Sequence, residues 1–400
     1  MTLRSVFFLM AMLFLVAGCS TTGRQLDGND EVPLQKSVVE IAEDRLLDVW
    51  IELFDAGQLP KDKDDAEGLS MDIREAEARY MPVQLRDTME KTGYWGAVRV
   101  VPQGTEGGEV LVQGTIVVSD AEQLKLRITA LDATGKQWFD RTYQAETSVE
   151  AYRKSQINGR EIFETLYNSI ANDLVEYRAS LTKKDIVAIR RVAALRFASD
   201  LAPDAFSGYL QRDDSGRFAV TRLPALDDPM YRRVNAIRER DFLLIDTLNG
   251  HFDNFYHEME EPYAQWRKTR SEEIEALRKI EREAMNRKLM GAAAIIGAIA
   301  IEVMGGNETR AATGTLRDVM IVGGAYAIKT GFDKDSETTI HRDAIEELGE
   351  SFSAETRPLV VEVEGETHEL TGSAEVQYNK WRGLLKRIYA SETGLNGEPD

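Results

Sequence analysis

The feature that most constrains the fold of this chain is a run of about 60 residues with few helix breakers, from Met230 to Leu289. Apolar side chains recur along it by threes and fours between Leu244 and Ala284, with a mean step of about 3.6 residues when Arg270 is counted. A strict coiled coil needs a step of about 3.5, so we expect long amphipathic helices packed on neighbouring elements. A continuous helix would reach about 90 Å, but Pro262 is expected to bend or split it.

An unusually apolar segment follows this run. Leu289–Ile301 is apolar all round and rich in Gly and Ala, and Asp318–Ile328 nearly repeats that character after a turn-like stretch at Gly305–Arg310. Each arm is shorter than the roughly 17 residues that a membrane-spanning helix needs. Small residues would let two helix backbones approach closely. The sequence therefore predicts an apolar helical hairpin over 291–331, either buried in the protein or an oligomer, or in contact with lipid.

The N-terminal half, from Val38 to about Arg178, has the pattern of a mixed α/β domain. Apolar residues at helical spacing predict a first helix over 38–53, ended by Gly57 and Pro60. Alternating apolar and polar residues predict a half-exposed antiparallel sheet. The further elements expected are helices over 73–91 and 159–177 and strands over 97–101, 109–118, 124–131 and 137–145.

The C-terminal half is expected to be mainly helical and elongated. Thr182 and Asp185 fit a capping box at the start of a helix that runs to Phe197. The elements expected near the end are a helix over 338–352, a β-hairpin formed by 359–363 and 367–370, a closing helix over 374–389, and a disordered tail over 391–400. The fold class predicted is α+β, with domains over 38–178, 179–290 and 332–400 on either side of the apolar hairpin.

Composition excludes some classes of ligand. The formal charge of −19 means a strongly acidic surface, which repels nucleic acid and anionic lipid head groups. Cys19 is the only cysteine, so no disulfide within the chain is possible and the fold must be held by its core. We expect no nucleic acid and no small-molecule substrate among the partners.

The first residues have the pattern of a signal peptide. Arg4 supplies a positive charge, and Val6–Leu15 is an unbroken apolar run that ends on small residues. Such a run is too short to span a hydrocarbon core of about 30 Å. We expect residues 1–18 to be removed, which takes the formal charge of the mature chain to about −20 because Arg4 leaves with them.

Val16, Ala17, Gly18 and Cys19 resemble the lipobox of bacterial lipoproteins. The resemblance implies cleavage between Gly18 and Cys19, a diacylglycerol on the Cys19 thiol and acylation of the new amino group. Two or more acyl chains give stable anchoring where one does not. Ser20 follows where an aspartate would imply retention in the inner membrane, so an outer-membrane anchor with a periplasmic body is expected. Residues 19–37 would be a lipidated tether; the alternative is an ordinary secretory signal.

Residues of about 80–178 resemble the small α/β domain of envelope accessory lipoproteins, such as transport-auxiliary lipoproteins, the curli-secretion lipoprotein and activators of penicillin-binding proteins. The likeness lies in a helix, the junction Thr92–Val98, a first strand, and a hairpin with the turn Asp132–Gly135. It implies a domain that binds protein partners and carries no catalytic residues.

Motifs for catalysis are partial. Ser180 with Lys183 matches S-x-x-K and Lys329–Gly331 matches K-T-G, but no S-x-N or Y-x-N lies between them, as a penicillin-binding enzyme requires. His341–Asp343 resembles the H-R-D of a kinase loop, but Leu348 stands where Asn is required. The sequence therefore predicts no catalytic site.

Motifs for metal binding are also weak. His251 and His257 are six residues apart, which on a helix turns their rings away from each other. Asp333 and Asp335 begin like a calcium loop that lacks its later ligands, and the acidic run 61–67 is a solvated loop. We expect no metal and no cofactor.

These patterns together predict a non-enzymatic outer-membrane lipoprotein that serves as a structural or accessory subunit of a cell-envelope complex, through a protein partner or as a homo-oligomer. The alternative is a lipid-handling or membrane-perturbing protein that uses residues 289–328. A cell-wall enzyme is the third reading.

Overall fold

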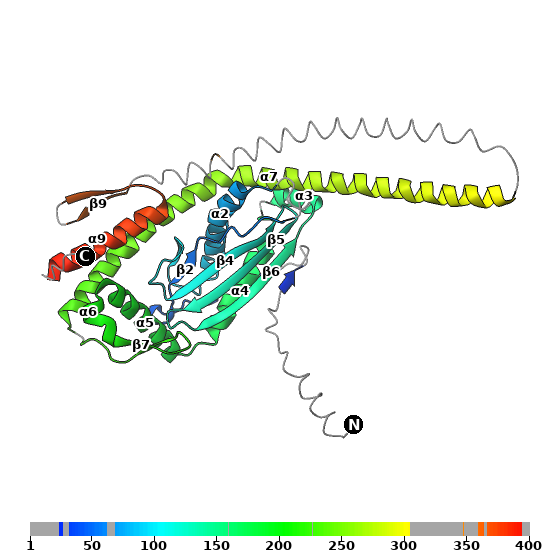
Figure 1. The fold of residues 1–400 in the computed structure, drawn as a ribbon. Coiled ribbons are helices and arrows are strands. Elements are labelled where there is room, and N and C mark those ends of the chain that lie inside the picture. Colours follow the sequence, from blue (N-terminus) through cyan, green and yellow to red (C-terminus); the bar gives the residue numbers. More distant parts are fainter. Residues whose placement is uncertain are drawn as a thin grey trace, which may run out of the picture.

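A mixed β-sheet lies at the centre of the computed structural model, which describes residues 24–26, 32–61, 69–158, 160–225, 227–304, 347, 359–363 and 366–393 (Figure 1). The sheet has the strand order β1-β6-β5-β4-β2-β3. Its strands are β1 (Arg24–Leu26), β2 (Val49–Glu52), β3 (Val98–Val101), β4 (Val110–Ser119), β5 (Gln123–Asp132) and β6 (Gln137–Glu146). The fold is α+β, as predicted from the sequence.

The two halves of the sheet differ in strand direction. β4, β5 and β6 form an antiparallel meander, as the alternation in the sequence predicted. β2 instead lies between β3 and β4 and pairs with both in parallel, and β1 pairs in parallel with β6. The prediction of an antiparallel sheet is therefore correct for only three of the strands.

The helix predicted over 38–53 is wrong. That region contains a 3₁₀ helix, Glu43–Arg45, and then β2, while Val38 and Val39 are exposed. All four residues of β2 are buried because both faces of this central strand are covered. A strand covered on both faces has no alternation, and so short an apolar run cannot be distinguished from part of a buried helix by periodicity.

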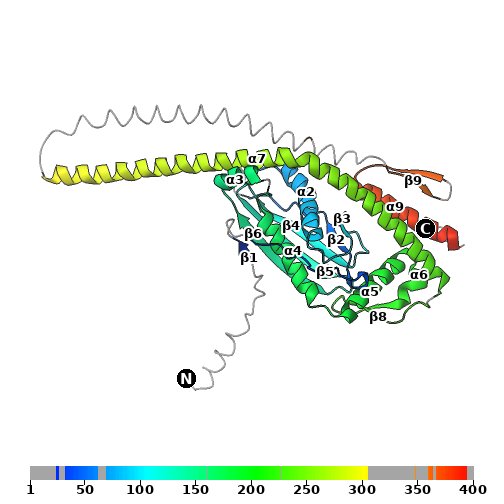
Figure 2. The ribbon, with the colours of Figure 1, turned by 180° about the vertical axis from the view of Figure 1, so that it is seen from behind.

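Two long helices cover one face of the sheet (Figure 2). They are α2 (Met71–Glu90) and α4 (Glu164–Ala179), and a shorter helix, α3 (Val149–Asn158), precedes α4. The buried side chains of β4 and β5 alternate with half-buried ones, and the buried set forms one core with α2 and α4. Both predicted helices exist, although α4 begins five residues later than expected.

After α4 the chain forms α5 (Lys183–Leu201), α6 (Pro203–Phe206) and the small hairpin β7 (Leu210–Arg212) with β8 (Phe218–Val220). The capping box predicted at the start of α5 is confirmed. Asp185 N–H donates to the Thr182 hydroxyl at 3.3 Å, and Thr182 N–H donates to the Asp185 carboxylate at 2.8 Å.

The predicted helical run is one helix of 76 residues, α7 (Pro229–Met304). Pro262 does not split it, which corrects the expectation of shorter rods. A proline inside a helix costs about 3 kcal/mol, and the neighbouring side chains offset this cost because Met259, Tyr263 and Trp266 are all buried. The predicted apolar stripe from Leu244 to Trp266 is buried, and beyond it α7 continues away from the sheet (Figure 1).

The C-terminal elements pack on the first part of α7. The predicted hairpin is confirmed as β9 (Leu359–Val363) and β10 (Glu366–Leu370). The closing helix is α9 (Ala374–Thr393), so residues 391–393, which were expected in the disordered tail, are helical. Aromatic and aliphatic side chains of α9 share a core with α5, α7, β2 and β3.

The boundary expected near residue 178 does not separate two cores. Ile186 and Val192 of α5 and Tyr263 of α7 belong to the same buried cluster as the sheet. Residues 291–304 of the predicted apolar hairpin form the end of α7, and its remaining residues, 305–331, lie outside the described residues. The helix expected over 338–352 also lies outside them, except for Glu347. Within the described ranges, no helix is long and apolar enough to cross a membrane.

Candidate functional site

The predicted lipidation site, Gly18 and Cys19, lies outside the described residues. The first described segment after it is β1, which pairs with β6 in the register Arg24 to Tyr143 and Leu26 to Ala145. The chain that leaves the predicted anchor therefore joins an edge of the sheet directly.

The end of the predicted tether is part of the folded domain. Residues Val32–Ser37, here called the docked segment, lie across α4 and are held by two asparagines of that helix. Asn168 Nδ2 donates to the first carbonyl of the segment at 2.9 Å. Asn172 Nδ2 donates to Pro33 O at 3.0 Å, and its Oδ1 accepts from Gln35 N at 2.8 Å. The expectation of a free tether up to residue 37 is thus wrong for its last six residues.

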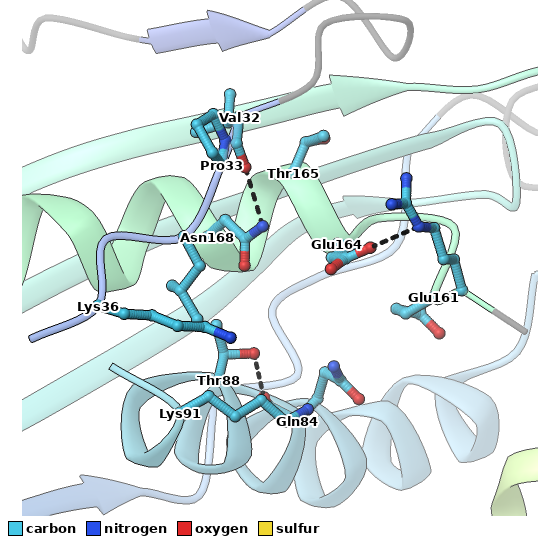
Figure 3. A pocket seen from close by; sticks show the side chains of 12 residues that line it. Val32, Pro33, Lys36, Gln84, Thr88, Lys91, Glu161, Glu164, Thr165 and Asn168 are labelled. Atoms are coloured by element: carbon cyan, nitrogen blue, oxygen red, sulfur yellow. Dashed lines mark hydrogen bonds and ion pairs between the residues drawn. The ribbon is translucent and has the colours of Figure 1, made fainter. Parts of the chain in front are cut away.

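A cavity of about 690 Å³ lies between the docked segment, α2 and the start of α4 (Figure 3). We call it the tether pocket. Its charged lining side chains are Lys36, Lys91, Arg160, Glu161 and Glu164. Figure 3 shows Lys36 and Lys91 on the left of the view and Glu161 and Glu164 on the right. Three separate stretches of chain thus contribute charge to one cavity.

Glu161 is neutralised by an arginine from α7. Arg267 Nη1 and Nη2 donate to its two carboxylate oxygens at 2.6 and 3.0 Å. Burial alone would raise the pKa of Glu161, but the charge of Arg267 and these hydrogen bonds outweigh it and hold the pKa below its ordinary value. The pair fixes α7 to the loop before α4 and leaves Glu161 with little net charge to offer a ligand.

The remaining charges of the tether pocket do not balance. Arg160 Nε lies 4.0 Å from the Glu164 carboxylate. The ammonium groups of Lys36 and Lys91 make no hydrogen bond or ion pair with any residue that the structure describes. Two positive charges therefore remain at the pocket, although the formal charge of the whole protein is −19. This local positive charge favours the binding of an anion.

Outside the pocket lining, α2, β4 and α7 meet at a buried carboxylate. Ser119 Oγ and Tyr263 OH both donate to Glu77 Oε1 at 2.6 Å, and Arg74 Nε lies 3.7 Å from its other oxygen. Burial raises the pKa of Glu77, with the charge of Arg74 acting in the opposite direction. This fully buried group has no route to a ligand, and we assign it the structural task of joining the three elements.

The partial S-x-x-K motif is not arranged as a nucleophile with its base. Ser180 Oγ donates to Tyr177 O at 2.6 Å, whereas Lys183 Nζ donates to Asp44 at 2.8 Å. The hydroxyl instead closes the last turn of α4, a common use of serine at a helix end. The K-T-G at Lys329–Gly331 and the H-R-D at His341–Asp343 lie outside the described residues.

The candidate metal ligands are not assembled either. His257 is exposed and lies 3.9 Å from Glu260, one turn along α7. Among the residues described, no group of three or more His, Cys, Asp or Glu side chains could hold a metal ion. Asp333, Asp335 and nearly all of the acidic run 61–67 lie outside those residues.

The tether pocket was not foreseen from the sequence, because one of its walls comes from the segment interpreted as a linker. Asn168 and Asn172 are four residues apart on the side of α4 opposite the apolar stripe of Leu166, Ile170 and Leu174, where amides ordinarily face water. The structure buries both. A pair of buried amides needs hydrogen-bond partners, and the docked segment supplies them.

Comparison of the chain with family models, with curated proteins and with solved structures finds no match.

Proposed function

We propose that this chain is a non-enzymatic lipoprotein anchored to the outer membrane through Cys19, with its body in the periplasm, and that it is a structural or accessory subunit of a cell-envelope complex. The lipobox-like residues support the anchor. The main support for a role as a subunit is the shape of α7, which packs within the domain and then continues beyond it (Figure 1).

The first part of α7 is held firmly. Arg86 of α2 pairs with Asp253 at 2.5 Å, and Arg99 of β3 pairs with Asp246 at the same distance. Arg278 pairs with Glu122, between β4 and β5, at 2.6 Å, and the helix runs on to Met304. At 1.5 Å per residue, the extension beyond Arg278 is about 40 Å long. A rigidly mounted extension of this length is suited to contact a second protein away from the domain.

The apolar stretch at the end of α7 supports a second candidate function. Leu289–Ile301 continues the helix and is apolar on every side in sequence, so lipid contact through residues 289–328 is the alternative to contact with protein.

In-cell photo-crosslinking from α7 tests the proposal. A photo-reactive residue at Lys279, which is exposed on the extension, should give a discrete adduct with an envelope protein or a second copy of the chain. The matched position is Lys184, exposed on α5, where we expect no such adduct. Crosslinks to lipid alone would favour the alternative. Equal labelling from both positions, with extraction in mild detergent as a partnerless monomer, would contradict a subunit role.

A further inference from the structure

We propose that the tether pocket binds the phosphate of an anionic lipid head group, at the membrane surface to which the chain is anchored. This assignment rests on the proposed function, because the lipid anchor proposed there is what brings the pocket near a membrane. It follows from the reach of the anchor, the route of the chain to the pocket, and the groups that line the pocket.

The anchor cannot hold the sheet far from the lipid. Arg24 is five residues beyond Cys19, and an extended chain spans at most about 3.6 Å per residue. The Cα atom of Cys19 therefore lies within about 18 Å of the start of β1, which pairs with β6 at Tyr143. This edge of the sheet must lie close to the membrane surface, rather than standing off it on a long tether.

The tether pocket adjoins the same edge. Tyr143 OH donates at 2.7 Å to Asp173 of α4, and Arg141 Nη1 donates to the same carboxylate oxygen at 2.7 Å. These bonds join β6 to the helix whose first turns line the pocket. Val32, at the start of the docked segment, is six residues beyond Leu26 of β1. The pocket is thus held within a short, fixed distance of the anchored strand.

The pocket offers donors that lack protein acceptors. Gln84 is 8% exposed, and its Oε1 accepts a hydrogen bond from Tyr256 OH, which directs its amide nitrogen to the other side. That nitrogen makes no hydrogen bond with a described residue. Together with the ammonium groups of Lys36 and Lys91 it provides N–H donors for phosphate oxygens. Lys36 and Lys91 are exposed, so a phosphate at the pocket would meet two solvent-accessible ammonium groups beside the Gln84 amide.

The overall acidity of the protein does not prevent this contact. The Debye length is about 8 Å at physiological ionic strength, so a head group in the pocket is influenced mainly by the charges that line it. The two lining carboxylates each have an arginine nearby, Glu161 with Arg267 and Glu164 with Arg160, whereas the two lysines have no carboxylate partner among the described residues. A patch of local positive charge next to an anchor also explains how an acidic protein would keep a preferred orientation on an anionic surface.

Vesicle flotation of the full mature chain carrying Cys19→Ser tests the assignment without any contribution from acyl chains. We expect binding to vesicles of phosphatidylglycerol mixed with phosphatidylcholine, and little to phosphatidylcholine alone. The double variant Lys36→Gln, Lys91→Gln should bind about thirtyfold more weakly, because each basic group near an anionic surface contributes about fivefold. The control variant Lys184→Gln, Lys279→Gln has the same charge change elsewhere and should bind as the parent does.

Equal weakening in the two double variants, or no preference for anionic vesicles, would overturn the assignment. Calorimetric titration with soluble glycerol phosphate distinguishes a lipid head group from a soluble phosphate ester as the ligand. Binding of that compound at the pocket without any vesicle binding would mean a soluble phosphate ester, and would also overturn it. Acylation plays no part in these measurements, so a negative result would contradict the phosphate site without contradicting the proposed anchor. The anchor is tested separately, by the mass of the natural protein.

Discussion

Asp241 of α7 is a carboxylate with no exposed surface, and it receives donors from one turn of α9. Trp381 Nε1 lies 3.2 Å from it, Tyr378 OH 3.5 Å and Arg382 Nη1 3.4 Å. Burial raises the pKa of Asp241 to about 6, while Arg382, the two side-chain hydrogen bonds and Arg238 act in the opposite direction. A carboxylate in this setting holds two helices together and also makes their packing dependent on pH.

The pKa of Asp241 predicts the sign of that dependence. Since the folded-state pKa of about 6 exceeds the ordinary value of 3.8, the folded protein binds this proton more tightly than the unfolded chain does. Its contribution to the free energy of unfolding is therefore present at low pH and falls by about 3 kcal/mol as pH rises from about 4 to about 6. Asp241→Asn should abolish this part of the change.

Urea unfolding of both proteins across that pH range measures the difference. Other acidic groups titrate equally in the two, so the natural protein should lose more stability than the variant as pH rises. Parallel stability curves would contradict the buried, titrating carboxylate. None of this was predicted from the sequence, because Asp241 looks there like an ordinary charged residue of an amphipathic helix.

At the level of elements, α7 closes one edge of the sheet. β3 is the last strand, and an open edge would leave its backbone groups without partners. Asn249 Oδ1 accepts from Val100 N at 2.8 Å, and Asn249 Nδ2 donates to Val100 O at 2.9 Å. One side-chain amide on the helix thus takes the place of the next strand.

Asn249→Ala should destabilise the protein by about 2 kcal/mol or more, because it leaves a buried N–H and a buried C=O without partners. The matched control is Asn254→Ala, which removes an exposed amide five residues further along α7 and should change stability by less than about 0.5 kcal/mol. Chemical denaturation of the two variants gives both values. Similar losses in the two would contradict edge closure by Asn249.

Sequence patterns predicted those elements whose burial has one clear period. The alternating strands β4 and β5 and the apolar stripe of α7 were predicted for that reason. β2 was misread because a strand buried on both faces has no period. Pro262 was expected to break α7 because its local cost is visible in sequence, whereas the packing of Met259 and Trp266 that offsets it is not. The docked segment has too few apolar residues to signal that it is bound.

In the whole molecule, α7 is the element to which the others are attached. Along its length it contacts α9 through Asp241, the edge of β3 through Asn249, α2 through Asp253, and the loop before α4 through Arg267. The predicted anchor enters at the opposite edge of the sheet, through β1. The proposed membrane contact and the C-terminal part of α7 are therefore linked by one continuous packed body, as a structural subunit requires.

The central claim is that acyl chains on Cys19 hold this body at a lipid surface. Intact-mass measurement of the protein purified from cell envelopes tests it most directly. We predict a chain that begins at Cys19 and carries the added mass of a diacylglycerol and a further acyl group. The variant Cys19→Ser should carry none of this added mass. A chain without acyl mass, or one that keeps residues 1–18, would contradict the account.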